Sequence, residues 1–119
     1  MTTYLYLRSI RKDMPMYTIE ERDGKIYAQI NVAQARITSL PDFSDNIFDF
    51  LDRNKGKLVV FDAEDFPIDD TSKSRIDTLA SLLPEHPNLR LRMPERFAQR
   101  FKDYFGERFV LTSEGYSLN

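Results

Sequence analysis

The segment KLVVF, residues 57–61, limits the fold more than any other part of the chain. It is continuously apolar, whereas a strand with one face in water alternates apolar and polar side chains. The segment therefore predicts a strand covered on both faces, inside a sheet. Helix-like patterns precede it at 44–54 and follow it at 72–83. This alternation indicates parallel neighbouring strands joined by helical crossovers.

A β-hairpin is predicted for residues 17–32, YTIEERDGKIYAQINV. Asp23 and Gly24 supply the two positive-φ positions of a type I′ turn between two strand-like runs. On the return strand every second side chain is apolar, which predicts one buried face and one face in water. The side chains expected on the buried face are Ile26, Ala28, Ile30 and Val32.

Three helices are predicted, each with an apolar stripe and a stop signal. The first has Ser44 as its N-cap and ends before Gly56. The second ends before Pro84, and the third has Pro94 at its first position and ends at Gly106. The inward residues expected are Ile47, Phe48, Phe50 and Leu51 in the first helix, Ile76, Leu79, Ala80, Leu82 and Leu83 in the second, and Phe97, Phe101, Tyr104 and Phe105 in the third.

Further strands are predicted at 3–7, 88–93 and 108–112. The strands and helices together predict an α/β (α+β) fold, a mixed β-sheet of about five to six strands packed with about three helices. A chain of this length forms a single domain, 1–119. Residues 1–14 would be an extra strand or extension on a core at 15–112. That extension could add an edge strand or pair with another chain, which makes a homodimer one expectation.

Composition narrows the class of protein. The chain has no cysteine, so disulfides, thiolate catalysis and cysteine metal sites are excluded. The same feature suits a reducing cytoplasm. No apolar run reaches the ~18 residues that a membrane span needs. A net charge of −2 argues against non-specific binding of nucleic acid.

An acidic cluster follows the predicted buried strand, where the ends of parallel strands often hold ligands. Its members are Asp62, Glu64, Asp65, Asp69, Asp70 and Asp77. The segment VVFDAEDF resembles the first motif of haloacid-dehalogenase-type phosphatases, in which a strand ends in Asp-x-Asp followed by Thr. Glu64 replaces the second Asp and Phe66 replaces the Thr. The Glu side chain is longer than Asp and would misplace the carboxylate for a proton transfer, which requires the two groups to lie ~3 Å apart. The acids also match no calcium loop. We expect no metal, no cofactor and no enzymatic activity.

The order of elements, with LVVFDAEDFPIDDTSKSRIDTL, resembles a STAS domain, the fold of anti-sigma-factor antagonists, over roughly residues 15–112. In that family a buried strand ends in Asp, and a loop leads through an apolar residue to Asp-Ser-Ser-Gly at a helix start. A partner kinase phosphorylates the first Ser. Asp62 matches the strand-end Asp, and Asp69 matches the Asp before the phosphoacceptor. The apolar loop positions are matched by Phe66 and Ile68.

The phosphoacceptor position of that motif departs from the family. Asp70 occupies it and Ser72 stands in place of the Gly. Three interpretations remain open: Asp70 mimics the phosphorylated state with a permanent charge, a one-residue slip makes Thr71 or Ser72 the acceptor, or one of Asp70, Thr71 and Ser72 is only the helix N-cap. The cap is the preferred interpretation.

A basic patch is predicted from Arg90, Arg92, Arg96 and Arg100, as a site for phosphate or an acidic partner. The first two share a strand face, and the other two are four residues apart on a helix. Residues 42–77 have an acidic bias, so the two halves could complement each other within one molecule or between two. His86, between two prolines, is expected to be an exposed loop residue without a role in a metal site.

The leading functional hypothesis is a bacterial, non-catalytic regulatory module. It would dock a protein partner, such as a regulatory kinase-like protein, through the acidic loop and helix start at 62–74. Asp62, Glu64, Asp65, Asp69 and Asp70 would contact that partner. The alternative is a small acidic inhibitor of the immunity type that covers a basic site on a toxin. The third hypothesis is an acid-dependent phosphoryl-transfer enzyme.

Overall fold

The computed structural model describes residues 15–119 of the chain, and the strand expected at 3–7 and the extension 1–14 lie outside them. The described residues form strands β1 (Tyr17–Arg22), β2 (Lys25–Ile30), β3 (Leu58–Asp62), β4 (Leu89–Arg92), β5 (Phe109–Thr112) and β6 (Gly115–Leu118). Their α-helices are α2 (Val32–Ile37), α3 (Leu40–Arg53), α4 (Asp70–Ala80) and α5 (Glu95–Phe105). Within this part of the chain no helix is long and apolar enough to span a membrane.

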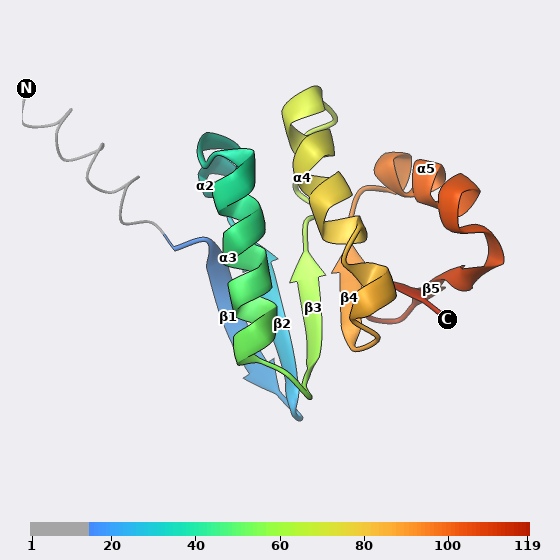
Figure 1. Cartoon of the computed structure of the whole chain (residues 1–119), viewed down its shortest axis with the longest axis horizontal. Coiled ribbons are helices and arrows are strands. Elements are labelled where there is room, and N and C mark those ends of the chain that lie inside the picture. The colour runs from blue at the N-terminus through green and yellow to red at the C-terminus, as the bar shows by residue number, and fades with distance from the viewer. Residues whose placement is uncertain (1–14) are drawn as a thin grey trace, which may run out of the picture.

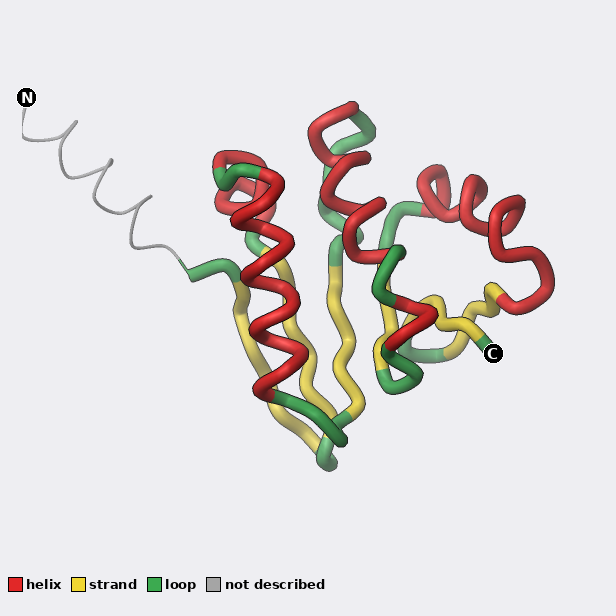
Figure 2. Tube along the Cα trace, in the orientation of Figure 1, coloured by secondary structure: helices red, strands yellow, loops and turns green. Residues whose placement is uncertain are grey.

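The strands form one mixed sheet in the order β1-β2-β3-β4-β6-β5. β2, β3 and β4 run parallel, while β1 pairs antiparallel with β2. At the other end, β6 pairs antiparallel with both β4 and β5. Figures 1 and 2 show α3 and α4 against one face of the sheet, with α5 beside the C-terminal hairpin. The predicted α/β fold with a mixed sheet is confirmed.

The N-terminal hairpin follows its prediction closely. Asp23 and Gly24 have φ values of 54° and 76°, as a type I′ turn requires. Ile26, Ala28 and Ile30 are buried in the core. The prediction was wrong beyond that point, because the strand ends at Ile30 and α2 begins two residues later. The Asn31 side chain accepts the Gln34 N–H and caps this helix.

β3 has both of its faces covered, as the continuous apolar run predicted. Val59, Val60 and Phe61 are exposed by only 2%, 1% and 0%. On the helix side, the Phe61 ring lies 5.5 Å from that of Phe50 in α3. β4 also follows its prediction, with Leu89 and Leu91 in the core.

Helix α3 begins five residues earlier than expected. The Ser39 side chain accepts the Asp42 N–H, so Ser39 and not Ser44 is the N-cap. Proline favours the first turn of a helix, and Pro41 lies there. The longer helix brings Phe43 into the core, and Phe48 is 46% exposed instead of buried.

The C-terminal part required three more corrections. Pro94 is the N-cap of α5 rather than its first residue, and Tyr104, expected inward, is 81% exposed. The final strand was expected to have a parallel neighbour. Instead β5 and the unpredicted β6 form an antiparallel hairpin. In the turn of this hairpin, the Glu114 Oε1 lies 2.8 Å from the Lys25 Nζ of β2.

Gly115 allows this hairpin to pack closely against β4. Its φ is +130°, and a Cβ at this position would lie 2.9 Å from the Leu91 carbonyl oxygen. Real Cβ atoms essentially never approach a backbone atom so closely. Glycine is therefore required here for two reasons, backbone conformation and space.

Candidate functional site

The loop from β3 to α4 lies at the carboxyl end of the parallel strands, at the upper edge of the sheet in Figure 1. Asp62 ends β3, and its Oδ1 accepts the Glu64 N–H at 3.0 Å. Phe66 is buried in the core at the middle of the loop. Ile68, two residues later, is 49% exposed. The loop therefore has one apolar anchor and one apolar side chain directed to solvent.

Two acids tie this loop to the neighbouring strands. Glu64 forms an ion pair with Arg92 at the end of β4, with Oε1 and Nε 2.5 Å apart. Asp65 accepts a hydrogen bond of 3.3 Å from the Gln29 side chain on β2. The loop is consequently held from both sides of β3.

Asp69 is the N-cap of α4, since its Oδ1 accepts the Ser72 N–H at 2.9 Å. The preferred prediction, which placed the cap at Asp70, Thr71 or Ser72, was therefore wrong by one to three residues. Both carboxylate oxygens of Asp69 also accept hydrogen bonds of 2.8 Å from Arg36. The Arg36 guanidinium, with the Ser72 N–H, lowers the pKa of Asp69 to about 2.

The two candidate phosphoacceptors have opposite exposures. Ser72 is fully buried, and its Oγ accepts a hydrogen bond of 2.8 Å from Arg36. Thr71 is exposed in the first turn of α4, next to the exposed Asp70. An enzyme can reach the Thr71 hydroxyl on the folded chain, whereas Ser72 would first have to be uncovered.

Arg75 of α4 holds the C-terminal end of α2. It is only 8% exposed, and its guanidinium donates to the carbonyl oxygens of Ala35 and Thr38. A buried guanidinium usually pairs with a carboxylate, but here helix-end carbonyls, which carry partial negative charge, accept its N–H groups. The same side chain also donates to the Ser74 hydroxyl at 2.9 Å.

Sequence reasoning missed both arginines that position the helix start. Arg36 and Asp69 are 33 residues apart, and Arg75 and Ala35 are 40 apart. Arg75 lies on the helix face that also carries Ile76 and Leu79, and this position was the only available sign of burial.

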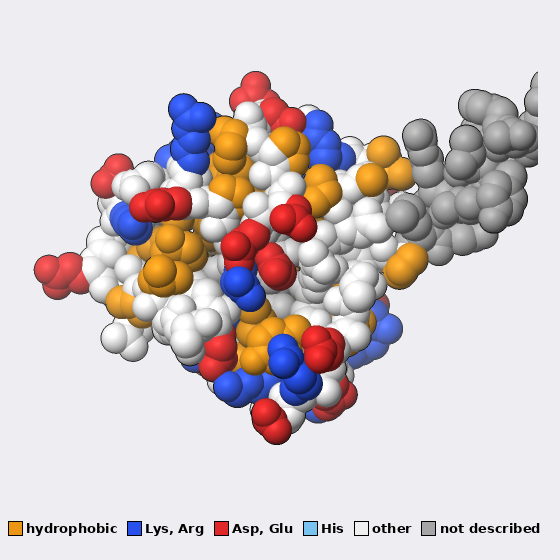
Figure 3. Space-filling view, turned by 180° about the vertical axis from the view of Figure 1, so that it is seen from behind, with side chains coloured by type: hydrophobic (Ala, Val, Ile, Leu, Met, Phe, Trp, Pro, Cys, Tyr) orange, Lys and Arg blue, Asp and Glu red, His pale blue; other side chains and the backbone are white. Residues whose placement is uncertain are grey.

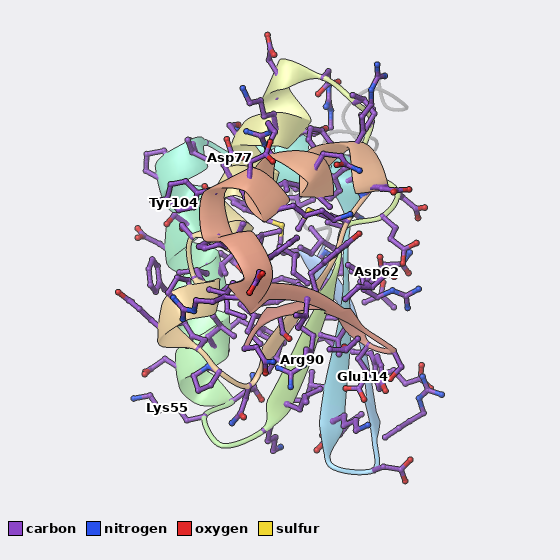
Figure 4. The ribbon with its side chains drawn as sticks, turned by 90° about the vertical axis from the view of Figure 1, so that its right-hand side faces the viewer. Lys55, Asp62, Asp77, Arg90, Tyr104 and Glu114 are labelled. Atoms are coloured by element: carbon purple, nitrogen blue, oxygen red, sulfur yellow. The ribbon has the colours of Figure 1, made fainter. Side chains whose placement is uncertain are left out.

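The predicted basic patch is not a single site. Arg90 donates to the carbonyl oxygens of its own strand and loop, at Pro87 and Leu89. Arg100 forms an ion pair of 2.6 Å with Asp77 of α4, and Arg92 has Glu64 as its partner. Figure 4 shows Arg90 and Asp77 far apart along the molecule. Two of the arginines thus neutralise acids of the acidic cluster within the same chain.

His86 lines a cavity of about 290 Å³ between the end of α3 and the start of β4, and is half-buried rather than fully exposed. Within residues 15–119, no group of three or more His, Asp or Glu side chains is placed to hold a metal ion. The rear face in Figure 3 has acidic, basic and apolar side chains interspersed, without a field of one sign.

The fold and this loop define an α/β protein whose mixed sheet presents an anchored loop and helix start at the carboxyl end of its parallel strands. Comparison with family models, with curated proteins and with solved structures found no significant match to the chain. Functional inference therefore depends on the geometry of the site.

Proposed function

We propose that the chain is a non-catalytic regulatory module of STAS type that docks a protein partner through residues 62–74. One observation carries the proposal: Ile68 is 49% exposed on a loop whose neighbours on both sides are held in place. Phe66 anchors one side in the core, and the ion pair of Asp69 with Arg36 anchors the other. A preorganised apolar side chain binds with little loss of conformational entropy.

A second exposed apolar side chain lies next to the same ion pair. Ile37 follows Arg36 directly at the end of α2 and is 58% exposed. Ile68 precedes Asp69 directly, so the two isoleucines flank the Arg36–Asp69 contact from different elements. Two apolar side chains with exposed Asp70 and Thr71 beside them form a surface that an apolar partner with a polar rim can cover.

The charge pattern favours this proposal over the toxin inhibitor. Glu64, Asp69 and Asp77 each pair with an arginine of the same chain, so much of the acidic charge is already neutralised. An inhibitor that recognises a basic site by charge needs that charge to be free. The phosphoryl-transfer hypothesis has less support too, since the Glu64 carboxylate, at the second motif position, is held by Arg92.

The resemblance to STAS domains implies a regulatory kinase-like protein as the partner, in a bacterial cytoplasm. Thr71 is then the phosphoacceptor that fits best, because its side chain is exposed while Ser72 is buried. A phosphate on Thr71 would add charge at a helix N-terminus, where anions are favoured.

The experiment is a capture of partners from the native host on immobilised protein, with two double variants. Ile68→Ser with Asp70→Asn alters the docking surface, while Phe48→Ser with Asp45→Asn makes the same kinds of change on α3. Phe48 is 46% exposed, close to the value for Ile68. We expect a protein that the wild type and the α3 variant retain and that the Ile68 variant loses. Equal retention by both variants would refute the proposed surface.

A further inference from the structure

Strand β1 forms one edge of the sheet (Figure 1), and its hairpin with β2 shows which of its main-chain groups point outward. The Asn31 N–H donates to the Met16 carbonyl oxygen at 2.8 Å, so Met16 faces β2. Orientation alternates along an antiparallel strand, and the N–H and C=O groups of Tyr17, Ile19 and Glu21 therefore point away from the sheet. Within residues 15–119 no strand pairs with that side of β1.

A groove of about 460 Å³ lies beside this edge, between β1 and α3. Its apolar lining includes Tyr17 and Ile19 of β1 and Phe50 of α3. The Tyr17 and Phe50 rings already pack with centroids 4.6 Å apart, whereas Ile19, on the same face of β1, is 55% exposed. A strand added beside β1 would place its own side chains over this groove and would cover Ile19.

The chain itself supplies a segment of suitable length and composition. Fourteen residues precede Pro15, which lies two residues before β1. They include TYLYL, residues 3–7, for which the sequence predicts a strand. A parallel neighbour of β1 needs a crossover of a dozen or more residues, whereas an antiparallel neighbour needs only a loop. The nine residues 8–16 are enough for that loop and too few for the crossover, so only the antiparallel arrangement fits.

We propose that residues 3–7 form a seventh strand of the sheet, antiparallel to β1 of the same chain. In the register that matches apolar with apolar side chains, Leu5 lies opposite Ile19 and Leu7 lies opposite Tyr17. The main-chain groups of Tyr17 and Ile19 point outward, so each pair exchanges two hydrogen bonds. Opposed side chains lie on the same face of a sheet, and both leucines therefore cover the groove.

The alternation of the segment favours this register over a slip by one residue. Tyr4 and Tyr6 point to the opposite face, beside the exposed polar side chains of Thr18 and Glu20, where their hydroxyl groups stay in water. A slip by one residue would exchange the two faces of the segment. Both leucines would then lie in water, so the apolar groove specifies the register.

Charge complementarity supports this segment as the occupant. The connecting residues 8–14 contain Arg8, Arg11, Lys12 and Asp13, three positive charges against one negative. The register places them near the start of β1, where the Tyr17 hydroxyl donates to Asn46 in the N-terminal half of α3. That half of α3 carries the exposed acids Asp42 and Asp45, which form no ion pair with any residue in the described range.

Disulfide trapping in the full chain tests the register, because the chain has no cysteine of its own. In the proposed strand, Tyr6 and Thr18 form a non-hydrogen-bonded pair with Cα atoms about 4.5 Å apart, within reach of a disulfide. Tyr6→Cys with Thr18→Cys should therefore form an intramolecular disulfide on mild oxidation. The matched control is Tyr6→Cys with Asp45→Cys, whose second thiol is also exposed but lies on α3, on the other side of the sheet.

We expect the control variant to cross-link at least about tenfold more slowly than the variant with both thiols on the strands. Equal rates, or no cross-link in either variant, would mean that the segment is not held on β1. A disulfide between two chains, seen as a dimer on a non-reducing gel, would place the segment of a second copy there. Each of these results would overturn the proposal.

Amide hydrogen exchange of the Ile19 N–H provides a second test, with variants that change only residues outside the described part of the chain. Leu5→Lys with Leu7→Lys removes the side chains that cover the groove, and Tyr4→Lys with Tyr6→Lys makes the same change on the opposite face. We expect slow exchange in the wild type, exchange at least about tenfold faster in the leucine variant, and a change of less than about threefold in the tyrosine variant. Fast exchange in the wild type, or equal acceleration by both variants, would refute the pairing.

Discussion

Replacement of Arg75 by alanine tests how the start of α4 is held. The Arg75 guanidinium donates to the Ala35 and Thr38 carbonyl oxygens at the end of α2 and is nearly buried. Alanine leaves these acceptors without their donor and opens space where the side chain packed. A hydrogen bond to a charged group contributes roughly 1.5–3 kcal/mol. Relief of the cost of burying the charge offsets part of the loss.

The expected decrease in the free energy of unfolding is therefore about 3 kcal/mol. For a chain of this length that corresponds to a melting temperature lower by roughly 10 °C. Arg75→Met keeps the apolar part of the side chain and removes only the donors. It should thus lose about half as much stability.

Urea denaturation followed by circular dichroism measures the difference, and Lys73→Ala is the control. Lys73 is exposed on the same helix, so its replacement should change stability by less than about 0.5 kcal/mol. Amide hydrogen exchange should also show faster exchange in α2 for Arg75→Ala. If Arg75→Ala costs no more than Lys73→Ala, Arg75 does not hold the two helices together.

Three other predictions follow from the packing and the charges. Gly115→Ala should lower the melting temperature measured by calorimetry by several degrees, because the alanine Cβ would meet the Leu91 carbonyl oxygen. An unchanged melting temperature would contradict the close approach of residue 115 to β4. In urea denaturation, Phe43→Ala should lower the free energy of unfolding by about 3–5 kcal/mol and Phe48→Ala by less than about 1 kcal/mol, because only Phe43 is fully buried. Equal losses would contradict a helix whose N-cap is Ser39. The pKa of Asp69 is lowered to about 2, so its ion pair stabilises the fold above about pH 4 and is lost as the pH falls toward 2. The stability difference between the wild type and Asp69→Asn should therefore shrink over that range, and a constant difference would exclude a role for ionisation.

The sequence predicted well those elements whose patterns are long and locally consistent. The type I′ turn at Asp23-Gly24 depends on two adjacent residues, and the burial of β3 depends on a continuous apolar run. Both are decided within a few residues, so no distant partner is needed to predict them.

Helix starts and short strands were predicted less well, because several local choices were equivalent. Ser39 and Ser44 are both suitable N-caps, and burial of Phe43 is consistent only with the earlier one. The four residues of β6 have no strong strand pattern, and Gly115 counts against a strand. That strand exists because glycine lets the chain approach β4 more closely than any other residue could.

The sequence predicted where the candidate site lies in the fold, but not whether its carboxylates are free or paired. Chain order places Asp62, Glu64 and Asp69 at the end of a buried strand, whatever the rest of the chain does. Whether those carboxylates are free or neutralised depends on arginines that are distant in the sequence and that folding brings to them. The acidic cluster is thus a local property of the sequence. Its pairing, on which our proposal of an apolar rather than a charged docking surface rests, is a consequence of tertiary packing, since Coulombic contacts require distances that only the fold sets.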